Sequence, residues 1–267
     1  MGRVLAISSQ VAHGAVGLSA AVPALQALGH EVIALPTILL SNHPGHARFA
    51  GERVSPALLD RMLDALDSNG WLAGLNAILT GYLPSSEHAA FAEAAVRRVK
   101  QLSPDALYIC DPVLGDHPRG LYIAQDAAEA IRSRLVPQAG VLKMNRFEAE
   151  WLSGTDIANS ADAHAAALRH HWRTVMITSL PATDAASLTN VLITSHASPV
   201  SIDVTRHDRV PNGTGDLFGA LWVGRRVRGH SDTGAFERTI EDVAQVISRS
   251  LHSDELQLAS ALKDLKP

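Results

Sequence analysis

The sequence has little cysteine, few aromatic residues, no strong excess of either charge and no long apolar run. Cys110 is the only cysteine among 267 residues, so the chain cannot form an internal disulfide, which indicates a cytoplasmic protein. The formal net charge of −4 gives no basic surface for nucleic acid. No segment reaches the ~20 apolar residues that a membrane-spanning helix needs. We therefore expect no role for nucleic acid or a membrane.

What the chain does contain is an alternation of short apolar runs with longer amphipathic segments. Hydrophobic residues make up 46% of it, which is enough for a substantial core. The alternation predicts an α/β fold with a central, mostly parallel sheet flanked by helices on both faces. The strand candidates are residues 3–8, 31–36, 75–81, 105–111, 140–144 and 173–179, and we expect the second to stop at Pro36.

The segment 187–208 has a different pattern. Two strand-like runs surround a short turn near HASP, which predicts an antiparallel hairpin at the edge of the sheet. Only helices are expected after it, from about Thr214 onward. No linker or internal repeat interrupts the chain, so we expect a single domain over residues 1–267.

Polar residues collect where the predicted strands end. In open α/β sheets, ligands bind at the carboxyl ends of the strands. One polar residue there is most often a turn former, but five strand ends in register indicate a site. The residues are Ser8 and Ser9, Gly81 and Tyr82, Asp111, Asn145, and Thr178 with Ser179.

The tetrapeptide GTGD, residues 213–216, stands before the apolar run LFGALWVG. The first turn of a helix has unpaired backbone N–H groups and a partial positive charge, and glycines let a phosphate approach them closely. Asp216 could then be kept ionised and accept a proton from an attacking hydroxyl group. The alternative is that Thr214 or Asp216 only caps the helix.

Three further segments carry polar groups that suit a nucleotide and its metal. In CDPVLGD, Asp111 and Asp116 offer the oxygen ligands that Mg²⁺ prefers, although a polar turn would also explain them. In NRFE, Asn145 and Glu148 share a helix face, or form a capping box. Residues 39–51, which include His43, form an irregular segment that we interpret as a flap over the substrate.

Together these segments resemble the pyridoxal kinases, a family of the ribokinase-like superfamily. The resemblance extends over nearly the whole chain. GTGD and the Asn–x–x–Glu spacing are shared across the superfamily, whereas the SNH of the flap, TGYL and CDPVLGD point to this family. The matching motifs, in order, are SSQVAHGAVGLSAA, LLSNHPGH, TGYL, CDPVLGD, NRFEAEWLSG, VMITS and GTGDLF.

The resemblance implies a role for each matching residue. Asp216 corresponds to the base that takes the proton of the substrate's 5′-hydroxymethyl group. The ATP-binding residues implied are Asp111, Asp116, Asn145, Glu148, Thr178, Ser179, Gly213, Thr214 and Gly215. Ser9, His43 and Tyr82, together with Asp216, correspond to contacts with the pyridine ring. Asp111 and Glu148 correspond to residues near Mg²⁺. The resemblance further implies ATP as co-substrate, leaves a monovalent cation open, and implies a homodimer.

The sequence departs from the family pattern at three places. Pro44 follows SNH, Lys143 and Met144 stand where proline usually precedes the asparagine, and Asn212 precedes GTGD. Lys143 either supplies a cation near the phosphates or extends from the strand end toward solvent. Two other functions stay open: a hydroxymethylpyrimidine kinase, which Asp216 and SNH disfavour, and a catalytically silent protein that binds pyridoxal or nucleotide.

Overall fold

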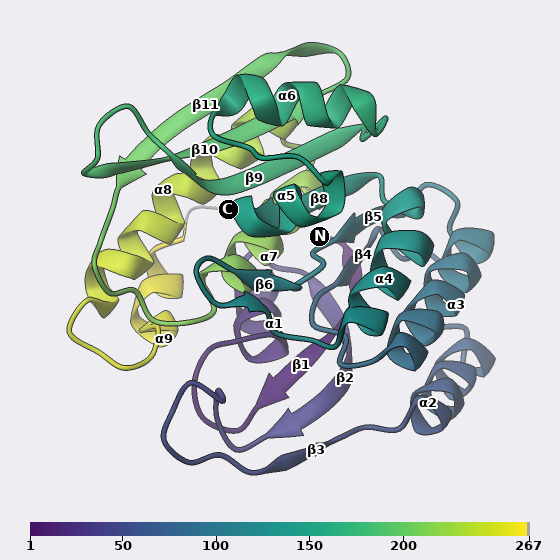
Figure 1. Cartoon of the computed structure of the whole chain (residues 1–267). Coiled ribbons are helices and arrows are strands. Elements are labelled where there is room, and N and C mark those ends of the chain that lie inside the picture. The colour runs from purple at the N-terminus through teal and green to yellow at the C-terminus, as the bar shows by residue number, and fades with distance from the viewer. Residues whose placement is uncertain (266–267) are drawn as a thin grey trace.

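The computed structural model describes residues 1–265 and arranges them around a nine-stranded sheet with helices on both faces (Figure 1). The strand order is β11-β10-β9-β8-β5-β4-β1-β2-β3. From β9 to β2 neighbouring strands are parallel, whereas β3, β10 and β11 are antiparallel to their neighbours. The strands are β1 (Arg3–Val11), β2 (Glu31–Leu40), β3 (Gly51–Arg53), β4 (Ala77–Thr80), β5 (Leu107–Cys110), β8 (Val141–Asn145), β9 (Thr174–Pro181), β10 (Ser187–Thr194) and β11 (Ala197–Thr205).

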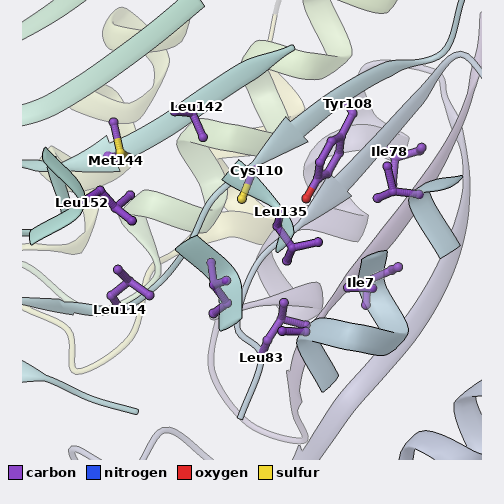
Figure 2. Packing of buried hydrophobic residues seen from close by; sticks show 14 of the residues in the cluster. Ile7, Ile78, Leu83, Tyr108, Cys110, Leu114, Leu135, Leu142, Met144 and Leu152 are labelled. Carbon is purple, nitrogen blue, oxygen red and sulfur yellow. The ribbon is translucent and has the colours of Figure 1, made fainter. Parts of the chain in front are cut away.

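Two hydrophobic clusters, one on each face of the sheet, hold the layers together. Figure 2 shows part of the first, in which Leu142 and Met144 of β8 lie near Leu152. Its helices are α2 (Pro56–Ser68), α3 (Ser86–Leu102), α4 (Gln125–Arg134), η1 (Val136–Gln138), α5 (Arg146–Ser153) and α6 (Ser160–Arg169). The helices of the second cluster are α1 (Leu18–Ala27), α7 (Thr214–Val227), α8 (Asp232–Ser250), α9 (Leu258–Ala261) and η2 (Leu262–Asp264).

The structure confirms the parallel sheet, the edge hairpin and the helices that follow the hairpin. The predicted end of the second strand at Pro36 is wrong, because β2 continues to Leu40. Pro36 pairs with Ser8, and the register between β1 and β2 shifts directly after this pair. Such an irregularity accommodates a residue that cannot donate a ladder hydrogen bond.

Two further strands, β1 and β9, are also longer than predicted, so some residues expected after a strand lie within one. Ser8 and Ser9 lie inside β1, which pairs with the extended part of β2. Thr178 and Ser179 lie inside β9, which continues along β10. A small antiparallel sheet of β6 (Gly115–Asp116) and β7 (Gly120–Leu121) was not predicted. Within residues 1–265, no helix combines the length and the apolar character that crossing a bilayer requires.

Candidate active site

The start of α7 lies against the loop that follows β1. Gly213 is the N-cap residue, and no side chain caps this helix, so the interpretation of GTGD as a mere side-chain cap is wrong. Gly213 has a φ of 98°, and a methyl group there would collide with the carbonyl oxygen of Ala15. Glycine is therefore required for this close approach. The first N–H groups of α7 stay available for an anion.

Asp216, in the first turn of α7, points toward the loops that follow β1 and β4. Its Oδ1 would lie 3.8 Å from a methyl group at Gly81, and its carboxylate accepts a hydrogen bond from the N–H of Gly17. We expected the helix dipole to keep this carboxylate fully ionised. Burial has the larger effect and raises the pKa of Asp216, although Gly17, Lys143 and His43 act in the opposite direction. A raised pKa makes the carboxylate a better general base.

Asp111, directly after β5, and Lys143, in the middle of β8, form a buried ion pair. Nζ of Lys143 lies 2.9 Å from Oδ2 of Asp111, and both side chains are about as buried as core residues, at 6% and 5% exposure. Burial lowers the pKa of Lys143, but the carboxylates of Asp111 and Glu148 outweigh it and leave the pKa raised. The ammonium group is therefore charged. A lysine that extends toward solvent is excluded.

Asn145 and Glu148 form the capping box of α5. The Glu148 carboxylate accepts hydrogen bonds from the backbone N–H groups of Leu114, at 2.9 Å, and Asn145, at 2.8 Å. Burial, followed by the nearby Asp111 carboxylate, raises the pKa of Glu148 to about 7. The Asn145 amide donates to the carbonyl oxygen of Gly115 at 2.7 Å, which ties β8 to β6. The capping interpretation is thus confirmed, and the same carboxylate lies beside Asp111.

The remaining residues of the nucleotide set lie around Asn145. Within residues 1–265, the buried Oδ1 of Asp116 accepts no hydrogen bond, which leaves it available to a ligand. Thr178 is the register partner of Asn145 in the neighbouring strand. Ser179 is exposed and has a φ of 65°, an uncommon conformation for a residue with a side chain.

The residues assigned to the substrate belong to β1, to the flap and to the loop after β4. Ser9 packs against Gly17, because a methyl group at Gly17 would collide with the Ser9 side chain. Tyr82 is half-buried, and its carbonyl oxygen accepts a hydrogen bond from the Thr37 hydroxyl at 2.8 Å. Burial lowers the pKa of His43. A methyl group at Gly45 of the flap would lie 3.6 Å from Nδ2 of Asn212, which directly precedes Gly213, so the flap lies near the start of α7. Ser9, His43 and Tyr82 therefore belong to segments that meet near the start of α7, where Lys143 approaches Gly215.

Two residues of this region were not predicted. Gly17 donates its N–H to Asp216, and its signal was the glycine-containing loop after the first strand. Glu255 lies 2.6 Å from His46 of the flap, measured from Oε1 to Nε2, and no local pattern marked it. Within the described residues, no group of three histidine, cysteine or acidic side chains is arranged to hold a metal by itself. A cation at this site would share its ligands with a substrate.

Comparison with known proteins identifies the family to which this geometry belongs. A family model described as phosphomethylpyrimidine kinase matches residues 12–259. The pyridoxal kinase of Corynebacterium diphtheriae is 33% identical over 261 residues, which cover 96% of this chain and 92% of that protein. The chain belongs to the pyridoxal kinase family.

Other pyridoxal kinases support the same assignment. A pyridoxine/pyridoxal/pyridoxamine kinase of Bordetella avium is 36% identical over 267 residues, covering 98% of this chain and 90% of that protein. The solved pyridoxal kinase of Leishmania donovani in complex with ADP and pyridoxamine superposes with a TM-score of 0.90 at 30% identity, covering 98% of this chain and 94% of that one. The family confirms the kinase class and the ribokinase-like fold expected from the motifs. The roles of single residues stay predictions.

Proposed function

We propose that this protein transfers the γ-phosphoryl group of ATP to the 5′-hydroxymethyl group of pyridoxal and related B6 vitamers. The observation that carries this proposal is the position of Asp216. Its carboxylate lies in the first turn of α7, beside uncapped backbone N–H groups, and faces the loops that hold Gly17 and Gly81. A base and an anion site thus share one helix start, as phosphoryl transfer to an alcohol requires.

The reaction follows from this arrangement. The hydroxymethyl oxygen attacks the γ-phosphorus of ATP. At the same time, the bond between this phosphorus and the oxygen of the leaving ADP breaks. Asp216 accepts the hydroxyl proton, which becomes acidic as the oxygen bonds to phosphorus. The N–H groups at the start of α7 stabilise the negative charge on the transferred group. The flap, held to Glu255 by His46, would keep water away from the phosphoryl group.

The residues present fit ATP with Mg²⁺. Asp111 and Glu148 offer hard oxygen ligands, and the unpartnered Oδ1 of Asp116 is a further acceptor. Mg²⁺, when bound, neutralises charge on the phosphate oxygens. We expect pyridoxal-dependent ATP consumption to vanish in excess chelator and to return with added Mg²⁺. Full activity without a divalent ion would exclude this part of the proposal.

Substrate identity is tested by comparing four alcohols. Purified protein would be given ATP with pyridoxal, pyridoxine, pyridoxamine or hydroxymethylpyrimidine, and ADP formation would be followed. We expect the highest kcat/KM with one of the three B6 vitamers. A preference for hydroxymethylpyrimidine would replace the proposed substrate, and the absence of ATP consumption with all four would refute the proposed function.

Location and assembly belong to the same proposal. The buried thiol of Cys110, whose pKa burial raises to about 12, suits a reducing compartment such as the cytoplasm, because it takes no part in a disulfide. The family resemblance supports a homodimer. Light scattering of the purified protein, with a mass near twice 28.4 kDa expected, tests the dimer.

A further inference from the structure

The ammonium group of Lys143 lies beside both Asp111, a candidate nucleotide ligand, and Gly215 at the start of α7. Its Nζ is 2.9 Å from Asp111, and a methyl group at Gly215 would lie 2.6 Å from the same nitrogen. Gly215 is in the first turn of α7, next to Asp216. The ammonium group therefore lies directly at the uncapped helix start, between a candidate nucleotide ligand and the candidate base.

The hydrogen bonds of this ammonium group are incomplete. A lysine has three N–H donors, and within residues 1–265 Asp111 is the only acceptor of Lys143. A buried ammonium group with a single partner is costly, since burial of a charge must be offset by several hydrogen bonds. Its unused donors therefore remain for a further anionic acceptor at the helix start.

We propose that Lys143 is a catalytic residue whose ammonium group binds the transferred phosphoryl group beside Gly215. The inference rests on the proposed function, because that function places the phosphoryl group at the start of α7. In the step, the hydroxymethyl oxygen bonds to the γ-phosphorus, the bond to the ADP oxygen breaks and the proton passes to Asp216. Lys143 keeps its own proton throughout and acts as a fixed positive charge.

A cation held in a fixed position stabilises developing negative charge without first having to move into place. Its position is set by β8 and by the ion pair with Asp111, so it needs no reorganisation when charge develops on the phosphoryl oxygens. The competing explanation is structural: Lys143 would only neutralise the buried Asp111. The two explanations differ once Asp111 has lost its charge.

The first experiment compares Asp111→Asn with the double variant Asp111→Asn/Lys143→Met. Methionine keeps the length and apolar volume of the lysine stem, and the asparagine background removes the unpaired carboxylate that would otherwise be left buried. If Lys143 contacts the phosphoryl group, kcat of the double variant should be about 10²- to 10³-fold below that of Asp111→Asn, as for loss of one oxyanion donor. Equal kcat values in both variants would overturn the proposal.

The second experiment does not depend on turnover. Calorimetry in chelator, without metal or pyridoxal, gives the affinities of both variants for ATP and ADP. A contact with the γ-phosphoryl group predicts that Lys143→Met lowers the preference for ATP over ADP by about tenfold or more. An unchanged preference would overturn the proposal even if the Asp111→Asn background were inactive.

The third experiment restores the charge chemically. Lys143→Ala leaves space for a small cation, so added ammonium ions should raise its pyridoxal-dependent turnover, whereas tetramethylammonium at equal ionic strength should not. Equal effects of the two salts would contradict a specific cation site. Failure of the proposed function has a different signature, because then the unsubstituted protein would consume no ATP with any of the B6 vitamers.

Discussion

Nε2 of His46 lies 2.6 Å from Oε1 of Glu255, so the flap is held to the segment that follows α8. The side chain of Glu255 is 13% exposed and that of His46 36% exposed, which makes this a partly shielded contact. The second oxygen of Glu255 lies beside Gly14, where a methyl group would approach it to 2.5 Å. Glu255 thus joins the flap to the loop after β1, and both cover the substrate side.

We expect Glu255→Gln to weaken flap closure more than nucleotide binding. A partly exposed contact of this kind contributes about 0.2–1 kcal/mol, so KM for pyridoxal should rise about 1.4- to 5-fold, while KM for ATP stays nearly constant. The matched control is Asp254→Asn, which breaks the exposed pair with Arg209 and leaves the flap untouched. A larger effect of the control than of Glu255→Gln would contradict the role of Glu255.

Hydrogen exchange of the flap tests the same closure directly. Amides of residues 42–50 should exchange more slowly when pyridoxal binds to the unsubstituted protein, and the slowing should be smaller in Glu255→Gln. If exchange slowed elsewhere but not in these residues, the substrate site would have to be placed elsewhere.

Two glycines of GTGD should respond differently to substitution by alanine. Gly213→Ala places a side chain at a φ of 98° and against the Ala15 backbone. The backbone strain alone costs about 1–2 kcal/mol, so Tm should fall by about 2–8 °C or more. At Gly215, which has no positive φ, the new methyl group meets only the end of Lys143 and no backbone atom, so Tm should fall less than in Gly213→Ala. We expect Gly215→Ala to lose turnover through displacement of that ammonium group, and normal turnover would contradict this.

Local patterns predicted the parts of the site that lie within single segments. The GTGD helix start, the Asn145–Glu148 capping box and the edge hairpin each depend on neighbours in sequence, and the structure contains all of them. The end of β2 was mispredicted, because the strand continues through Pro36 at a register shift that its partner strand permits. Strand length in a sheet depends on the neighbouring strand as well as on local propensity.

Long-range contacts could not be predicted in the same way. Glu255 and His46 are 209 positions apart, and no motif links them. The sequence leaves the two interpretations of Lys143 open, because its partner Asp111 lies 32 positions away, directly after another strand. The ionisation of Asp216 was predicted from the helix dipole alone, whereas the burial that raises its pKa comes from loops of distant sequence.

His30 should make the protein sensitive to acid. Its Nδ1 accepts from the N–H of Gly2 and its Nε2 donates to the carbonyl oxygen of Gly224, so the ring is neutral. Burial lowers its pKa, and the terminal ammonium group and Arg228 lower it further. The unfolded state therefore binds the proton more strongly, and the stability that His30 contributes is present above the unfolded pKa and is lost as pH falls toward the lowered folded pKa.

We expect His30→Gln to reduce the loss of Tm between pH 7 and pH 5, because the variant has no ring to protonate. Its Tm at pH 7 should be lower than that of the unsubstituted protein, since the hydrogen bond from Gly2 is lost. The control is His196→Gln, in the exposed turn of the edge hairpin. Identical acid sensitivity in His30→Gln and the unsubstituted protein would contradict the assignment to His30.

Asp216→Asn separates the catalytic role of this residue from a structural one. Asparagine keeps the size of the side chain, and its oxygen can still accept the hydrogen bond from Gly17. Because burial raises the pKa of Asp216, the ionised carboxylate costs stability above its usual pKa, so Tm of the variant at pH 8 should be equal or higher. Asparagine cannot take the hydroxyl proton, so kcat with pyridoxal should fall by ~10²–10⁴. ATP affinity should be unchanged or tighter, since a negative charge near the γ-phosphate has been removed.

Exposed Asp208→Asn is the control for the charge change alone and should keep normal kcat. Near-normal turnover of Asp216→Asn would refute its assignment as the base, and a large fall in Tm would show that the carboxylate supports the fold instead.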